Sequence, residues 1–269
     1  MSQNTLAIKY ILAFCFLISF GFPGLAQKSF FTGTNLGAKA GASRLLTEIP
    51  YSFSETINEF DNKAGFAFSL EASKFLSSRW ETGLEWNNFT LKGNTYTPEF
   101  SAEGGFQEGI PAEITEPVEY NSHLNGLNLL FRYYFKPVTE ETAFNPFVRF
   151  GGGILHYKSV FKYIDSEETI FGTDKYNINL NTPVFNLGTG FKTTLSTRFY
   201  MVTSFDFNLV PYDFLDVMHN YDQDGNRNEL LGLYAEFKVG IFYNLSPVKQ
   251  KKGGSARYSA SEFLPFARR

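Results

Sequence analysis

A chain of 269 residues with a formal net charge of −3 is long enough for one or two domains, and its slight acidity argues against nucleic acid as a partner. Its single cysteine, Cys15, lies in the first apolar stretch, so the expected mature chain has no disulfide framework and no thiolate site. Aromatic residues make up 18% of the chain, with 31 Phe and 15 Tyr. Together with 23 glycines this composition suits a membrane β-barrel, in which alternate strand residues face lipid, although a soluble all-β protein can share it.

The first 26 residues have the pattern of a cleavable signal peptide. Lys9 precedes a ten-residue apolar run over 11–20, and Gly24 and Ala26 supply small side chains before the expected cleavage site. The run is about half the length of a membrane-spanning helix, which needs roughly 20 residues. We therefore predict that residues 1–26 direct export, and that the mature chain crosses a membrane as strands if it crosses one at all.

The mature chain repeats an alternation of period two, which predicts β-strands. In one such segment, Trp80, Leu84 and Trp86 alternate with Glu81 and Glu85. Every predicted strand has one face of large apolar residues and one face of glycine, small polar and charged residues. The predicted strands cover 34–44, 64–76, 79–91, 123–135, 146–157, 183–195, 198–210 and 230–245.

The narrow interior of an eight-stranded barrel decides which face points inward. It could hardly hold the Phe, Trp and Leu side chains of all eight strands, whereas glycine and charged residues fit it. We therefore predict an all-β fold, an eight-stranded antiparallel up-and-down transmembrane β-barrel over 27–245, with its apolar face toward outer-membrane lipid. Aromatics near the strand ends are predicted to form interfacial girdles: Trp80, Trp86, Tyr133, Tyr157, Tyr200, Tyr212 and Tyr243.

Short and long connections alternate along the chain, which is typical of outer-membrane barrels with short periplasmic turns and long extracellular loops. The long connections contain 19 of the 27 Asp and Glu residues and cover 45–63, 92–122, 158–182 and 211–229. These acidic loops either remain solvated or bind a partner. The tail over 246–269 has six Lys or Arg residues and one Glu, and is predicted to be a disordered periplasmic segment.

The last predicted strand resembles the terminal β-signal of outer-membrane barrels. Lys238, Gly240, Tyr243 and Leu245 match its order of polar, glycine, aromatic and hydrophobic positions. The resemblance implies that the barrel-assembly machinery recognises this stretch. The chain departs from the pattern because it continues for 24 residues past Leu245.

Two further segments resemble PorT-like outer-membrane β-barrel proteins of Bacteroidetes. Residues 146–153, Pro-Phe-Val-Arg-Phe-Gly-Gly-Gly, are similar to the fifth strand of that family, and residues 186–192, Asn-Leu-Gly-Thr-Gly-Phe-Lys, to its sixth. The resemblance covers about 30–245. It implies an outer-membrane barrel and an accessory role in the envelope or in secretion.

Ten charged residues fall on the faces predicted to line the lumen. Charges of both signs in a narrow interior should pair, because an unpaired buried charge is costly. We expect a salt-bridged plug; the alternative is a gated pore whose pairs exchange to pass ions or small solutes. The ten residues are Lys39, Glu71, Glu81, Glu85, Arg132, Arg149, Lys192, Asp206, Glu236 and Lys238.

One loop contains a weak calcium pattern. Asp222, Asp224, Asn226 and Asn228 alternate as oxygen ligands can in a calcium loop. Gly225 is at the fourth position rather than the sixth, so the loop is not an EF-hand, and a plain turn explains it as well.

Three histidines leave open a rim-sited enzyme. His123 adjoins Ser122, and Asp216 lies near His219, while His156 is predicted at the extracellular end of its strand. Adjacency in sequence does not make a catalytic triad. The sequence therefore favours a non-enzymatic surface protein that binds an extracellular or envelope protein, with a narrow pore and a rim enzyme as the alternatives.

Overall fold

The computed structural model of the protein is built from β-strands, and no helix long and apolar enough to span a membrane occurs in the part of the chain that it describes. The described residues are 33–50, 60–96, 100–101, 113–114, 116–138, 143–172, 180–211, 215 and 230–245. The predicted signal peptide, basic tail and calcium loop lie outside them. The strands are β1 (Thr34–Pro50), β2 (Asp61–Lys63), β3 (Gly65–Phe75), β4 (Trp80–Thr95), β5 (Phe100–Ser101), β6 (Glu113–Ile114), β7 (Val118–Tyr134), β8 (Phe144–Tyr163), β9 (Thr169–Gly172), β10 (Leu180–Thr194), β11 (Phe199–Val210) and β12 (Leu230–Asn244).

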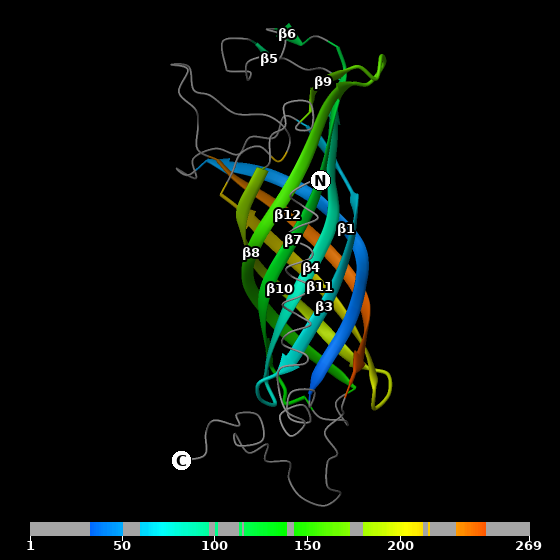
Figure 1. Cartoon of the computed structure of the whole chain (residues 1–269), viewed down its shortest axis with the longest axis vertical. Coiled ribbons are helices and arrows are strands. Elements are labelled where there is room, and N and C mark those ends of the chain that lie inside the picture. Colours follow the sequence, from blue (N-terminus) through cyan, green and yellow to red (C-terminus); the bar gives the residue numbers. More distant parts are fainter. Residues whose placement is uncertain are drawn as a thin grey trace, which may run out of the picture.

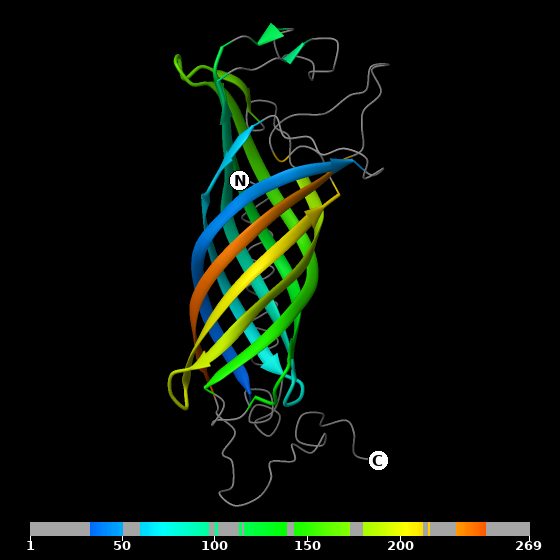
Figure 2. The ribbon, with the colours of Figure 1, turned by 180° about the vertical axis from the view of Figure 1, so that it is seen from behind.

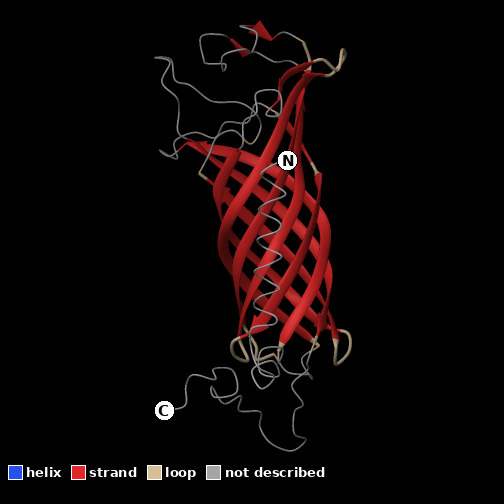
Figure 3. Ribbon diagram, in the orientation of Figure 1, coloured by secondary structure: helices blue, strands red, loops and turns tan. Residues whose placement is uncertain are grey.

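Eight long strands form one closed antiparallel barrel (Figures 1 and 2). Their order around the barrel is β1, β3, β4, β7, β8, β10, β11 and β12, and β12 pairs with β1 to close it. Each strand therefore lies beside its neighbours in the sequence, as in an up-and-down meander. Figure 3 shows strands crossing the whole height of the barrel at a steep tilt. The predicted fold class is confirmed.

The strand register fixes the width of the barrel. From His156 on β8, successive paired positions lead once around the sheet and return to β8 at Pro146, ten residues lower, through Asn125, Asn88, Phe68, Ala40, Val239, Thr203 and Phe191. For eight strands this shear implies a strand tilt of about 41° and a radius of about 8 Å. Side chains alone can fill so narrow a lumen.

Large apolar side chains cover the outside of the barrel. Leu84 is 51% exposed, Leu187 65% and Phe237 49%, and the exposed set draws on all eight long strands. The outer rings also contact one another, as in the stacked pair of Phe131 and Phe150 with centroids 5.6 Å apart. The predicted inside-out arrangement is therefore confirmed for the strand region that faces lipid.

Two hairpins at one end of the barrel are built in the same way. In the turn between β3 and β4, the Ser77 hydroxyl accepts hydrogen bonds from the backbone amides of Arg79 and Trp80. Between β10 and β11, the Ser196 hydroxyl accepts hydrogen bonds from the backbone amides of Arg198 and Phe199. The following arginines reach outward-facing tyrosines: Arg79 donates to the Tyr133 hydroxyl at 3.3 Å, and Arg198 donates to the Tyr243 hydroxyl at 2.9 Å. These tight turns are the short connections that outer-membrane barrels place in the periplasm.

At the opposite end, one side of the barrel rises above the rest. The upper parts of β4, β7 and β8, flanked by β2 and β9, form a sheet that we call the extension, and Figure 1 shows it standing above the ends of the other strands. β7 has 17 residues and β8 has 20. About ten residues at this tilt would cross a 25 Å apolar band.

The extension corrects the predicted strand ends. Segments 45–63, 92–122 and 158–182 were predicted as loops, yet their outer parts belong to strands: β1 and β2 in the first, β4 and β7 in the second, and β8 and β10 in the third. In the extension the alternation is reversed: Leu91, Tyr120 and Phe161 point inward and are buried, while polar residues point outward. The reversal has a physical cause, since water replaces lipid as the outer solvent beyond the band. The predicted strands therefore ended too early, because they were recognised by an outward apolar face that is lost beyond the band.

The apolar band predicts how a charge on the outer surface is tolerated. Leu84 lies four residues from both Trp80 and Asn88, near the middle of the band, so Leu84→Arg should destabilise the barrel by about 2–4 kcal/mol. Val160→Arg, on the outer face of the extension, is the control and should have little effect. Urea unfolding in lipid vesicles measures both variants. Equal losses in the two variants would contradict the position of the band.

Candidate functional site: the barrel lumen

The lumen collects all ten charged residues that the sequence pattern assigned to it. Each is at most 6% exposed, and together they comprise five cations and five carboxylates. Their formal charges therefore cancel inside the barrel. The cations are Lys39, Arg132, Arg149, Lys192 and Lys238, and the carboxylates are Glu71, Glu81, Glu85, Asp206 and Glu236.

Glu85 on β4 is the hub of this network. One of its carboxylate oxygens contacts the amines of Lys39 and Lys238, the latter at 3.2 Å, and the other accepts from Arg149 at 2.9 Å. The three cations come from β1, β12 and β8. Glu85 therefore ties together strands from opposite parts of the closed sheet.

The network continues from the hub toward the periplasmic end. Lys39 also binds Glu71 at 2.9 Å, and Arg132 bridges Glu71 and Glu81, the latter at 3.1 Å. The Glu81 carboxylate also accepts hydrogen bonds from three neutral donors, Asn35, Ser73 and Tyr134. Every carboxylate in this part therefore has a cationic partner.

On the other side of the hub, two acidic residues balance Arg149 and Lys238. Arg149 Nε lies 2.8 Å from Asp206, and Lys238 lies 3.2 Å from Glu236. The Asp206 carboxylate packs so closely against the adjacent strand that a Cβ at Gly188 would overlap it. A glycine on the inward face is therefore required at this position.

Lys192 lies against aromatic rings. Its amine lies 3.8 Å from the Tyr200 ring centroid and 4.7 Å from that of Phe75. Such contacts are favourable because the face of an aromatic ring attracts a cation. These rings belong to an inner aromatic layer at the periplasmic end, which we call the lower ring layer: Phe75, Tyr134, Phe147, Tyr200 and Phe242.

A second apolar layer lies in the lumen toward the extracellular end. Phe89 and Tyr234 stack with centroids 5.0 Å apart, and Phe60 packs edge-on against Tyr120 and Phe161. All five are at most 3% exposed. The described part of the lumen is thus a charged middle between two apolar layers.

The inner ring layers are what the sequence analysis missed. Tyr157 and Tyr200 were predicted in the outer girdles, but they point inward and are 0% and 4% exposed, so that prediction was wrong for both. The strand alternation contained the signal: Tyr200 has the parity of Asp206, and Phe242 has the parity of Lys238. The prediction failed because Tyr157 and Tyr200 were assigned to the outer girdles by residue type and by their position near strand ends.

The predicted assembly-signal residues lie at the seam that closes the barrel. Lys238 and Gly240 face the lumen, where a Cβ at Gly240 would collide with the backbone of β1. Tyr243 points outward and contacts the Phe199 ring at 5.1 Å. The Leu245 amide donates to the Thr34 carbonyl at 3.0 Å. Their recognition by the assembly machinery stays a prediction.

The described histidines are separated from the residues suggested as catalytic partners. The Ser122 side chain is buried inside the barrel, whereas that of His123 is exposed outside it. The two cannot form a dyad across the wall. His156 contacts Asn181 on the outer face at 3.1 Å. His219 and Asp216 lie outside the described residues, as do Asp222, Asp224, Asn226 and Asn228, and the described part contains no group of three or more His, Cys, Asp or Glu suited to a metal.

A closed sheet with a lipid-compatible outside and a polar, ion-paired inside defines a transmembrane β-barrel of the outer-membrane class. No protein-family model matches the sequence. No curated protein sequence matches it either.

Solved structures with similar folds include three outer-membrane proteins. Neisserial surface protein A is 8% identical over 79% of this chain and 97% of its own, with a TM-score of 0.42. The outer membrane protein OprG from Pseudomonas aeruginosa is 11% identical over 79% of this chain and 97% of its own, with a TM-score of 0.36. E. coli outer membrane protein W is 13% identical over 79% of this chain and 98% of its own, also with a TM-score of 0.36. At these scores the likenesses carry no weight, and the class rests on the geometry of the barrel itself.

The hub predicts a large effect for one neutralising change. Glu85→Gln leaves Lys39, Lys238 and Arg149 without their shared carboxylate, and should destabilise the barrel by about 3–5 kcal/mol in urea unfolding. Glu85→Gln combined with Lys39→Met restores charge balance and should recover part of the loss.

Glu119→Gln is the matched control for this substitution, because Glu119 forms an exposed ion pair with Lys162. Exposed pairs contribute little, so no measurable change is expected. A Glu85→Gln variant as stable as the control would contradict the role of Glu85 as the hub.

Proposed function

We propose that the protein is a closed, non-enzymatic surface protein of the outer membrane, whose extracellular parts bind a partner in the envelope. The observation that carries the proposal is the ion-paired middle of the lumen between two ring layers. A lumen with a radius of about 8 Å at the backbone has little room left once these side chains occupy it. The barrel then acts as an anchor, and its activity lies outside the lumen.

The narrow pore is the second candidate, and the charged lumen is the feature that favours it. Ions could pass only if the pairs around Glu85 and Arg132 separated. Separating a buried pair costs about 3–5 kcal/mol, and the ring layers would have to move as well. The network therefore supports a closed state.

The extension supports partner binding. It raises the turn between β8 and β9 above the barrel, and this turn presents the exposed acidic residues Asp165, Glu167 and Glu168. Glu167 adopts a positive φ of 57°, a conformation that is uncommon outside glycine. An accessory role in secretion, as the resemblance to PorT-like proteins implies, belongs to the same class of function.

Electrical recording tests the closed state. Purified full-length protein in a planar bilayer should give no reproducible conductance, and Lys162→Gln, outside the lumen, should behave in the same way. Arg132→Ala removes a side chain that bridges Glu71 and Glu81, and should produce leak events if the network is the barrier. Steady conductance of the wild-type protein that changes with Arg132 would contradict the proposal and favour the pore.

Deletion of the gene tests the accessory role. Cells without the protein should retain secreted proteins in the periplasm, while uptake of small hydrophilic solutes stays unchanged. Plasmid-borne wild-type protein should restore secretion. A defect in solute uptake with normal secretion would contradict the proposal, because it would assign the function to the lumen.

A further inference from the structure

The outer face of the barrel has a group of basic side chains just above its apolar band. Arg44 on β1, Lys63 on β2, Lys92 on β4 and Lys158 on β8 are all exposed, and we call them the basic collar. Three of them fall in segments that the sequence analysis treated as acidic loops. The fold brings them to the outer face of β1, β2, β4 and β8.

The collar follows the edge of the lipid-facing surface. Lys63 lies three residues from Phe66, which is 61% exposed, and Lys158 lies four residues from Ile154, which is 64% exposed. At the strand tilt of this barrel each residue rises about 2.5 Å, so both amines begin within roughly 10 Å of the apolar band. This is the depth at which lipid headgroups lie.

Two lysines of the collar come from neighbouring strands. Lys63 and Lys92 are directly opposite each other on paired strands and point outward. Like charges in such a pair are destabilising unless an anion screens them. Lys63 pairs with Asp61, whose pKa is lowered by this hydrogen bond, but the described residues offer Lys92 no ion-pair partner.

Carboxylates on this face lie farther from the lipid than the two lysines. Asp61 lies two residues beyond Lys63, and Glu119 lies opposite Asn94, two residues beyond Lys92. Glu119 also pairs with Lys162 at 3.0 Å, which raises the pKa of that lysine. The charge nearest the band is therefore positive.

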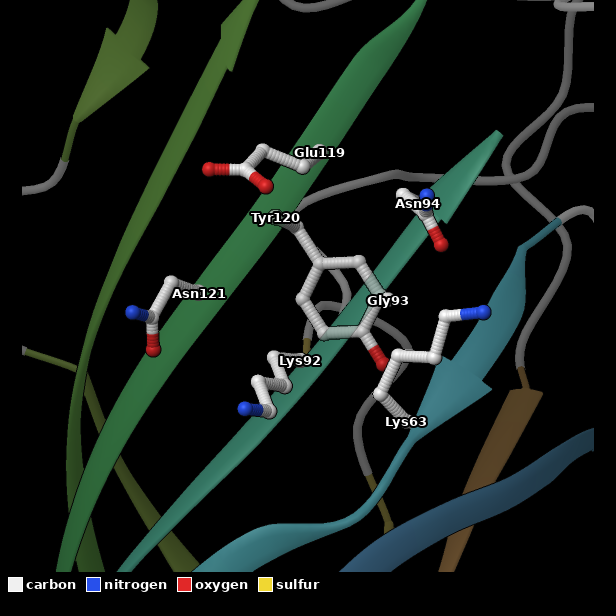
Figure 4. Close-up of a pocket in the computed structure, with 7 residues that line it drawn as sticks. All are labelled: Lys63, Lys92, Gly93, Asn94, Glu119, Tyr120 and Asn121. Carbon is white, nitrogen blue, oxygen red and sulfur yellow. The ribbon is translucent and has the colours of Figure 1, made fainter. Parts of the chain in front are cut away.

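A pocket of about 410 Å³ opens between the two lysines and their neighbours. Figure 4 shows its lining residues coming from three neighbouring strands, β2, β4 and β7. The lining set combines amines and amides with one carboxylate: Lys63, Lys92, Gly93, Asn94, Glu119, Tyr120 and Asn121. Behind the pocket, Gly93 packs against the inner apolar layer, where a Cβ would approach the Tyr120 ring to 2.6 Å. Amines suit phosphate oxygens, and amides suit sugar hydroxyls.

We propose that the basic collar and this pocket bind the phosphorylated saccharide headgroup of a glycolipid in the outer leaflet around the barrel. The headgroup supplies the anion between Lys63 and Lys92, and its acyl chains lie along the adjoining apolar band. A bound glycolipid would connect the base of the extension to the membrane surface. The assignment is independent of whether the lumen conducts and of which partner the loops bind.

Binding of a defined glycolipid tests this assignment. Full-length protein in detergent is titrated with an acylated glucosamine disaccharide that bears two phosphates, and with the same lipid after removal of the phosphates. The lysine variant is Lys63→Gln combined with Lys92→Gln. The charge-matched control is Lys136→Gln combined with Lys249→Gln, which alters the opposite end of the barrel and the tail.

The wild-type protein and the control should bind the phosphorylated lipid with the same affinity, and the lysine variant about 25-fold more weakly, at roughly five-fold per basic residue. The dephosphorylated lipid should bind the wild-type protein as weakly as the phosphorylated lipid binds the lysine variant. Equal affinity of the lysine variant and the wild-type protein, or of the two lipids, would overturn the proposal. Binding of inorganic phosphate alone with the affinity of the phosphorylated lipid would also overturn it, because the site would then recognise free phosphate rather than the headgroup.

Discussion

Lipid on the outside of a narrow closed sheet is the constraint on which the rest of this structure depends. Strand side chains alternate, so every strand that turns Leu or Phe toward lipid must turn its other residues toward an interior about 8 Å in radius. Ten of those residues are charged, and the interior is too narrow to surround each of them with water. They must neutralise one another, as the five cations and five carboxylates of the lumen do. Glu85 has the central place because its two oxygens accept contacts from three cations on three strands.

The same constraint explains why the barrel changes character along its axis. Where lipid ends, the outward residues become polar and the inward residues become apolar, so the upper part of β4, β7 and β8 is organised like a water-soluble sheet. The two inner ring layers, represented by Tyr200 below and Tyr234 above, flank the charged middle. Outside, the change of solvent coincides with the basic collar. The polarity of the residues on each face of a strand thus follows the medium, lipid or water, that surrounds the barrel at that level.

Much of this architecture could be predicted from sequence, because period-two patterns and short turns are local signals. The eight strands and the inward direction of residues such as Lys39 and Arg149 follow from alternation, and the strand order follows from the lengths of the connections. The partners of those charges could not be predicted, since pairing depends on the shear, which is a property of the closed sheet. The ends of β7 and β8 were predicted wrongly because the alternation reverses polarity there. Tyr200 was misassigned for a related reason: residue type was given more weight than strand parity.

The central claim is that the outward rings of the apolar band face lipid while ions occupy the middle of the lumen. It can be tested directly with the two tryptophans, Trp80 and Trp86. Both are outward-facing, Trp80 at the short-turn edge of the band and Trp86 well inside it. The measurement is tryptophan fluorescence of the Trp80→Phe and Trp86→Phe variants in vesicles of lipids brominated at different depths. Trp86 should be quenched most by bromine deep in the acyl chains, and Trp80 by bromine near the headgroups. Absence of quenching at every depth in both variants would place the rings away from lipid and contradict the account.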